Sequence, residues 1–174
     1  MKKKRAIALT AAAALAVAGI AWGQAGAKAT AQLAPTKGNT ATGTATFTQR
    51  GGKVLVEVKM SGLAPGAEHG FHIHEKGDCS ADDAMSAGGH FNPLGKPHAH
   101  FSTPDRHAGD MPALKADASG NASVAVELDV ITVTDGPTGI VGRGLVVHAQ
   151  PDDYKTQPTG NSGARVACGV IQKG

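Results

Sequence analysis

An all-β sandwich of short strands with two long loops is the fold class that the sequence predicts, and two observations indicate it. Short runs alternate polar and apolar residues with a period of two, most clearly over 53–60, and turn-forming residues separate these runs. No stretch after the N-terminal segment carries the apolar stripe of a helix. Strands are therefore expected at 41–48, 53–60, 69–75, 111–117, 122–129, 142–149 and 165–172.

Turn and loop signals divide these strands. Gly51-Gly52 predicts a hairpin between the first two, and residues 118–121 predict another between the fourth and fifth. The segment 28–40 is polar and mixed, and no strand is expected there. The irregular segments 76–110 and 150–164 are long enough to indicate functional loops.

Residues 1–27 have the layout of a secretory signal peptide. A basic start at 2–5 precedes an almost wholly apolar run at 6–22, and an A-x-A pattern ends at Ala27. We expect cleavage after Ala27, with Ala29 as the alternative. The apolar run is barely long enough to span a bilayer, so no stable membrane insertion is expected after removal of the signal.

Removal of the signal changes the charge balance of the chain. The full sequence has 17 Lys and Arg against 14 Asp and Glu, and four of the basic residues lie in the signal. The remainder, 28–174, has the length of one domain and is slightly acidic, which argues against nucleic acid as a partner. The signal predicts export, with the periplasm favoured and an extracellular or cell-envelope location left open.

The chain has two cysteines, Cys79 and Cys168, and both lie in the exported part. In an exported protein an even pair predicts a disulfide. Two buried thiols are the alternative, which export makes less favourable.

The eight histidines are the most informative residues, because seven of them fall within 69–107. In a strand, His72 and His74 share one face while their neighbours enter the core, so the two imidazoles can bind one metal ion. His148, at the end of another predicted strand, can supply a third nitrogen. Taken alone, His72 and His74 could equally be polar residues on an exposed strand face.

The first long loop carries a second set of potential ligands, His90, His98, His107 and Asp110. Three imidazoles and one carboxylate suit zinc, whereas imidazoles without thiolate suit copper. Asp110 by itself is more typical of a turn, and its place three residues after His107 makes it a ligand candidate. The sequence therefore predicts ligands for two metal ions.

Four stretches of the chain resemble the copper/zinc superoxide dismutase family. They are Gly70-Phe71-His72-Ile73-His74-Glu75, Gly89-His90-Phe91-Asn92-Pro93, Gly144-Leu145-Val146-Val147-His148 and Gly163-Ala164-Arg165-Val166-Ala167-Cys168-Gly169. The similarity covers nearly all of 28–174 and implies a Greek-key antiparallel β-sandwich or flattened barrel of about eight strands. The placement of Cys79, together with the signal peptide, is similar to the exported bacterial branch of the family.

The resemblance also implies an activity, the conversion of two superoxide anions and two protons to dioxygen and hydrogen peroxide. The implied cofactors are copper, held by His72, His74, His90 and His148, and zinc, held by His90, His98, His107 and Asp110, with His90 bridging the two ions. Arg165 is implied at the mouth of the copper site, where its charge would dock the anion, so Arg165 and His90 are the expected catalytic residues. Asp152 is implied to tie two of the ligands, His72 and His98, together.

Some residues stay outside this assignment. His69 has no ligand role in the family pattern, and His100 could compete with His98 for zinc. Met85 could be a soft copper ligand, although a single methionine is more typical of a packing residue. Cations that could steer superoxide are Lys76, Lys96 and Lys155, without a ranking among them.

Two other functions compete with the enzyme. A dismutase-like, copper-binding carrier without turnover would be expected to lack the bridge, a copper ligand or the arginine, and the sequence has all of them. A structural domain that binds zinc alone would leave the remaining histidines idle. The expected partner is superoxide as a small-molecule substrate, and a homodimer is left open.

Overall fold

A computed structural model describes residues 26–174, so the predicted signal peptide at 1–27 lies outside it except for its last two residues. Over the described residues the chain is all-β apart from one 3₁₀ turn, η1 (Met85–Ala87). No helix in this part is long and apolar enough to cross a membrane. The strands are β1 (Lys28–Pro35), β2 (Thr42–Arg50), β3 (Lys53–Ser61), β4 (Glu68–His69), β5 (Phe71–His74), β6 (Leu114–Lys115), β7 (Ala122–Leu128), β8 (Gly144–His148), β9 (Arg165–Val170) and β10 (Gln172–Lys173).

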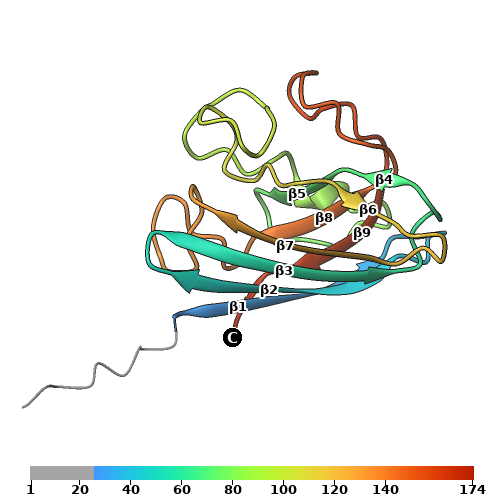
Figure 1. Ribbon diagram of the computed structural model, residues 1–174, viewed down its shortest axis with the longest axis horizontal. Helices are drawn as coiled ribbons and strands as arrows, with labels where there is room; N and C mark the ends of the chain where they lie inside the picture. The colour runs from blue at the N-terminus through green and yellow to red at the C-terminus, as the bar shows by residue number, and fades with distance from the viewer. Residues whose placement is uncertain (1–25) are drawn as a thin grey trace, which may run out of the picture.

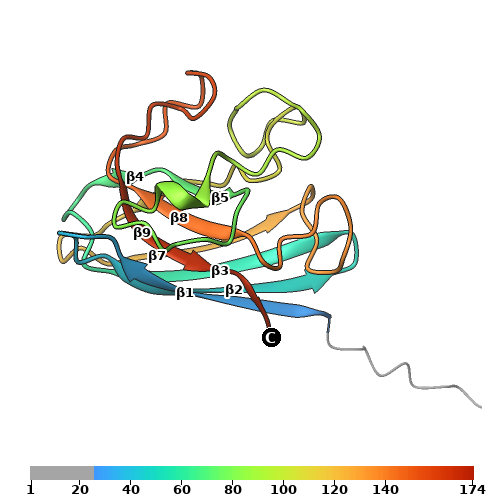
Figure 2. The same cartoon turned by 180° about the vertical axis from the view of Figure 1, so that it is seen from behind.

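The main strands form one antiparallel sheet that curls into a flattened half-barrel, with β5 and β7 at its two ends. Eight strands belong to it, in the order β5-β8-β9-β1-β2-β3-β7 with β10 paired to β1, and β4 pairs separately with β6. In Figure 1, β1, β2, β3 and β7 form one layer, over which β5, β8 and β9 lie. The two long loops rise from the same side of the barrel in both views (Figures 1 and 2). The predicted sandwich is confirmed, and both functional loops lie above β5 and β8.

The expectation that 28–40 holds no strand is wrong over its first part. There β1 pairs with β2, β9 and β10. Ala29, Ala31 and Leu33 of this strand are buried, and they alternate with exposed residues. Because alanine contrasts weakly with threonine and glutamine in hydrophobicity, the period-two pattern of β1 is faint in the sequence.

The predicted hairpin between 111–117 and the next strand is also wrong. Only Leu114–Lys115 forms a strand, β6, which pairs with β4, whereas β7 pairs with β3 along its whole length. The turn itself closes, since the amide of Asp117 donates to the carbonyl of Asn121 at 2.8 Å. The two segments separate after this turn, because β7 pairs with β3 and β6 pairs with β4.

The core consists mainly of small and branched apolar side chains, as the low aromatic content requires. Val54, Val56 and Val58 of β3 are buried, and they belong to the same cluster as Phe47 of β2 and Ile73 of β5. Such close packing leaves little freedom for the backbone of β5. The strand that carries the first histidine pair is therefore a rigid support.

Cys79 and Cys168 form the predicted disulfide, which joins the first long loop to β9 across 89 residues. The bond lies in a small buried cluster with Ala84, Ala87 and Val146. It therefore fastens the beginning of the first loop to the barrel, and it fits an exported protein.

Replacing both Cys79 and Cys168 by serine should lower the free energy of unfolding by about 4–5 kcal/mol, because the bond restricts the unfolded chain by about that amount for a loop of this length. Denaturant titration of the metal-free protein, followed by circular dichroism, measures the change. The control is the parent protein in a thiol reductant, which should unfold at the same denaturant concentration as the variant. An unchanged midpoint would contradict the prediction.

Candidate metal centre

Strand β5 is the support of the centre. Its alternation sends Phe71 and Ile73 into the hydrophobic core and His72 and His74 to the opposite face. All four residues are buried, because the two long loops cover the outer face. The pair of histidines therefore lies between the barrel and its loops, away from water.

Backbone pairing brings other ligand candidates beside β5. Isolated bridges place His90 opposite His74 and Asp110 opposite His72 on one side of the strand. On its other side β5 pairs with β8, and the amide of His148, the last residue of β8, donates to the carbonyl of Gly70 at 2.8 Å. The sheet itself therefore brings together residues far apart in the sequence.

One cluster consists of four imidazoles, each offering a nitrogen atom within 4.8 Å of the others: His72, His74, His90 and His148. Two of them already use their Nδ1 atoms, which donate to backbone carbonyls, His74 to Gly88 at 2.9 Å and His148 to Gly163 at 3.2 Å. Their Nε2 atoms therefore carry lone pairs, and these two atoms face each other at 3.3 Å. Two facing lone pairs repel each other unless a cation lies between them.

Two further nitrogens of this cluster have no hydrogen-bond partner among the described residues. They are Nδ1 of His72 and Nε2 of His90, and both are buried. Leaving a buried polar atom unpaired costs about 1–3 kcal/mol, so native proteins rarely tolerate it without a reason. Four converging imidazole nitrogens without thiolate fit copper.

The second cluster contains His90, His98, His107 and Asp110, again with ligand atoms within 4.8 Å of one another. Oδ1 of Asp110 lies 3.1 Å from Nδ1 of His90, 2.9 Å from Nδ1 of His98 and 3.5 Å from Nδ1 of His107. Three Nδ1 atoms thus surround one carboxylate oxygen. This donor set, three nitrogens and one oxygen, fits zinc.

His90 belongs to both clusters. Its Nδ1 faces Asp110 in the second cluster, while its Nε2 is the free nitrogen of the first. The ring stacks on His72 with the two centroids 3.9 Å apart, and its side chain is almost completely buried. One imidazole can therefore contact two cations at once.

Asp152, at the start of the second long loop, is a second link between the two clusters, in addition to the shared His90. Its Oδ2 lies 2.6 Å from Nε2 of His72, and its Oδ1 lies 2.9 Å from Nε2 of His98. A carboxylate only accepts hydrogen bonds, so it keeps a proton on each Nε2 and leaves both Nδ1 atoms free for metal. Gly160 has a positive φ of 66° and passes so close to this pair that a Cβ atom would collide with Asp152.

Burial sets the charge of the first cluster. It lowers the pKa of His72 to about 3, although the hydrogen bond with Asp152 acts in the opposite direction. Burial likewise lowers the pKa of His148 to about 4 and that of His74 well below its ordinary value. These rings are neutral at physiological pH, which is the form that binds metal ions.

The second cluster attracts positive charge. Burial acts to lower the pKa of His98, but hydrogen bonds with Asp110 and Asp152 outweigh it and raise the pKa to about 9. Burial acts to raise the pKa of Asp110, but hydrogen bonds with His107, His90 and His98 hold it well below its usual range. The carboxylates therefore stay ionised, and a zinc ion would satisfy the same charges that hold a proton on His98.

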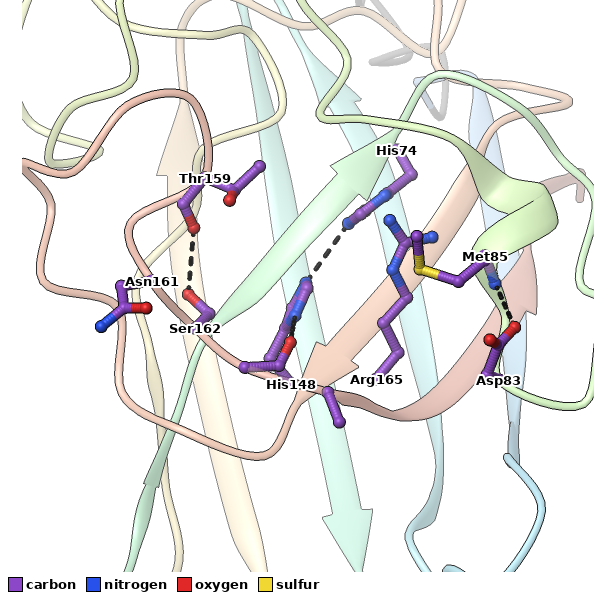
Figure 3. A pocket seen from close by; sticks show the side chains of 10 residues that line it. His74, Asp83, Met85, His148, Thr159, Asn161, Ser162 and Arg165 are labelled. Carbon is purple, nitrogen blue, oxygen red and sulfur yellow. Dashed lines mark hydrogen bonds between the residues drawn. The ribbon is translucent and has the colours of Figure 1, made fainter.

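Arg165 lies at the mouth of the first cluster. In the ladder between β8 and β9 it is paired with His148, and it lines a pocket of about 470 Å³ with His74 and His148 (Figure 3). Its guanidinium donates to the carbonyls of Ala84 and Gly88, both at 2.6 Å. Of the described residues that line this pocket, Arg165 is the only one with a positive charge.

The structure also places the residues that the sequence left open. His100 donates to or accepts from Ser102 at 2.8 Å and packs against Tyr154, so it belongs to neither cluster. Lys96 pairs with Asp105 at 2.7 Å, and none of the three candidate lysines lines the pocket. The interpretation of Met85 as a packing residue is wrong, because Met85 is 61% exposed.

Two supporting residues carry no recognisable signal in the sequence. The side-chain amide of Gln157 accepts from the backbone N–H of His98 at 2.8 Å and donates to its carbonyl at 2.7 Å. Buried His69 donates from Nδ1 to the backbone carbonyl of His148 at 2.7 Å. Both contacts fix the backbone of a ligand candidate, and neither follows from spacing or residue type.

Comparison with known proteins identifies the family. The family model described as copper/zinc superoxide dismutase matches residues 41–171. The chain belongs to the copper/zinc superoxide dismutase family. It is 43% identical over 149 residues to superoxide dismutase [Cu-Zn] 2 of Aquifex aeolicus (strain VF5), which covers 83% of this chain and 86% of the relative. Superoxide dismutase [Cu-Zn] 1 of the same organism is 43% identical over 134 residues, with 75% and 79% covered.

Solved structures agree with this membership. The clock protein EA4 superposes with a TM-score of 0.76 at 43% identity, covering 83% of this chain and 93% of that one. A double mutant of a SOD-like protein from Bacillus subtilis superposes with a TM-score of 0.73 at 39% identity, covering 82% and 96%. The copper and zinc of the family correspond to the two kinds of donor set found in this superoxide dismutase fold.

Replacing Asp152 by asparagine should weaken zinc binding by about 10–100-fold, because His72 and His98 donate to different oxygens of Asp152, and the amide puts an NH₂ donor in place of one of them. Competition with a chromophoric chelator measures zinc affinity. The matched control is Asp153→Asn, which changes an exposed neighbour in the same loop. Equal affinity in the Asp152 variant and the parent would contradict the prediction.

Proposed function

We propose that the chain converts two superoxide anions and two protons to dioxygen and hydrogen peroxide at a histidine-bridged copper/zinc site. The observation that carries the proposal is the pair of buried ligand clusters that share His90. A pocket beside them holds one arginine to receive an anion. Membership of the family supports the same activity.

The free ligand atoms support an assignment of each metal ion. Copper would be held by Nδ1 of His72 and by Nε2 of His74, His90 and His148. Zinc would be held by Nδ1 of His90, His98 and His107 and by Oδ1 of Asp110. When bound, copper supplies one-electron redox chemistry and zinc supplies a fixed charge that orders the loop.

Arg165 binds and orients the substrate. Two of its N–H groups are held by the carbonyls of Ala84 and Gly88, which keep the guanidinium plane fixed. The remaining N–H groups are free to donate to an anion in the pocket, since arginine has five donors. Because no lysine lines the pocket among the described residues, Arg165 contributes the local positive charge there.

His90 can handle one of the two protons that the reaction consumes. Its Nδ1 is engaged beside Asp110, so Nε2, the atom that would bind copper, is also the atom that could hold a proton whenever copper is not bound to it. Burial lowers the pKa of His90, although the hydrogen bond with Asp110 opposes this. A proton on Nε2 is therefore readily given up, as proton delivery to a reduced oxygen species requires.

The copper carrier without turnover is the less favoured alternative. A carrier needs an accessible cation site and has no use for a shared imidazole or for an arginine fixed by two carbonyls. The presence of both features in one pocket favours catalysis.

The activity also suits the location that we propose, the periplasm. Removal of residues 1–27 would leave Lys28, the first residue of β1, as the N-terminus, so the barrel would begin directly after the cleavage site. The disulfide is consistent with export from the cytoplasm.

The assignment of ligands predicts a selective loss of each metal. His148→Ala should abolish retention of copper while keeping zinc, because His148 belongs only to the first cluster. Asp110→Ala should abolish retention of zinc, because it removes the one carboxylate of the second cluster. Elemental analysis of reconstituted protein should give about one of each metal per parent chain. A parent that retains zinc alone would contradict the two-metal assignment.

Metal-loaded parent protein should remove superoxide far faster than the spontaneous reaction, and Arg165→Ala should lower this rate by about tenfold or more, because the docking charge is lost. Pulse radiolysis measures the rate, and elemental analysis checks that metal content is unchanged. Arg165→Lys, which keeps the charge without the planar fork, should fall between the two.

Two outcomes would contradict this prediction. Removal of superoxide at the background rate by fully loaded parent protein would mean that the chain is not a dismutase. Equal rates in the parent and in Arg165→Ala would remove Arg165 from the mechanism while leaving the activity in place.

A further inference from the structure

Met85 is the most exposed of the large apolar side chains among the described residues, and the metal centre does not explain its exposure. It is 61% exposed, whereas the other two methionines among the described residues, Met60 and Met111, are 4% and 1% exposed. It lines the pocket of the first cluster together with Arg165 (Figure 3). An exposed thioether at the entrance of a site that releases peroxide is open to oxidation.

The turn that carries Met85 is held rigidly beside Arg165. The carbonyls that accept from the guanidinium belong to Ala84 and Gly88, which directly flank η1. The amide of Met85 also donates to Oδ1 of Asp83 at 3.0 Å. Figure 3 shows the side chains of Met85 and Arg165 in the lining of the same pocket. The turn that carries the thioether is therefore fastened to the residue that carries the docking charge.

We propose that Met85 is an oxidation site for hydrogen peroxide, and that the resulting sulfoxide weakens the docking of superoxide at Arg165. Peroxide released through this pocket passes the one described methionine that is accessible to it. The inference rests on the proposed function only for the source of the peroxide. Oxidation at this position limits the enzyme when its product accumulates.

The chemistry needs no other reactant. A sulfur lone pair of Met85 attacks one oxygen of hydrogen peroxide, the S–O bond forms, and the O–O bond breaks. The second oxygen leaves with both hydrogen atoms as water, so sulfur is oxidised by two electrons and peroxide is reduced by two. The product, methionine sulfoxide, is polar and is reversed by methionine sulfoxide reductases.

The sulfoxide changes the entrance of the site in two ways. Its oxygen is a strong acceptor and can occupy N–H groups of Arg165 that Ala84 and Gly88 leave free. Its negative end also faces an incoming anion, and it adds an atom to the mouth of the pocket. Both effects reduce the rate at which superoxide binds, and neither touches the metal ligands.

The test uses zinc-loaded, copper-free protein, so that the metal chemistry of copper plays no part. Timed treatment with hydrogen peroxide, followed by peptide mass mapping, should show Met85 gaining one oxygen atom at least about tenfold faster than Met60 or Met111, because susceptibility follows exposure. This readout does not depend on dismutase activity, so it stands even where the proposed function fails.

The consequence is tested on the same samples. After peroxide is removed and copper is loaded, the oxidised parent should lose about half or more of its rate relative to its untreated sample, and a methionine sulfoxide reductase should restore it. Met85→Leu, treated identically, should keep its own untreated rate, and Met111→Leu is the matched control that should behave like the parent. Equal oxidation of all three methionines would overturn the inference. So would a full rate in oxidised parent, or an equal loss in Met85→Leu.

Discussion

The whole centre depends on one imidazole, that of His90, being buried with both of its nitrogens directed at other ligands. Burial removes the water that would otherwise satisfy Nε2, and no described residue replaces it. Asp110 on the other side keeps a full negative charge, because hydrogen bonds with His107 and the other histidines hold its pKa well below the usual range. Burying unpaired nitrogens beside an ionised carboxylate is unfavourable, whereas two cations would satisfy all of these groups. The arrangement is therefore complementary to two metal ions.

Regular strands and irregular loops contribute differently to this arrangement. His72, His74 and His148 come from paired strands over a packed core, so the sheet sets the positions of their backbones, and hydrogen bonds orient their rings. The ligand candidates of the second cluster come from an irregular loop, and each needs its own anchor. His98 has the largest number of them: Gln157 holds its backbone on both sides, and Asp152 holds its ring. The second long loop therefore serves as a brace for the first.

The sequence predicted the parts of the site that follow local rules. A period of two in a strand was enough to place His72 and His74 on one face, and the structure brings both into the first cluster. Strand β1 was not predicted, because its buried positions are mostly alanine and the contrast between its faces is weak. The partner of β7 was wrong as well, since pairing with β3 depends on how the whole sheet curls.

Other features could not be predicted from the sequence for a different physical reason. Gln157 and His69 contact backbone atoms of residues 59 and 79 positions away. Every residue has the same backbone atoms, so the sequence does not indicate which residue such a side chain will contact. The exclusion of His100 from the second cluster likewise depends on the direction in which the loop turns its ring, toward Tyr154. Spacing alone favoured His98 over His100 without supplying that reason.

The disulfide and the docking arginine act on one segment of chain. Ala84 and Ala87 are buried against the bond between Cys79 and Cys168, and the carbonyl of Ala84 accepts from Arg165. Cys168 follows Arg165 by three residues in β9, so the strand that carries the arginine also carries one end of the disulfide. Reduction of the disulfide would free the loop that orients the guanidinium. The fixed orientation of the proposed docking charge therefore depends on an oxidised cysteine pair, and that ties the arrangement at the substrate pocket to an oxidising compartment.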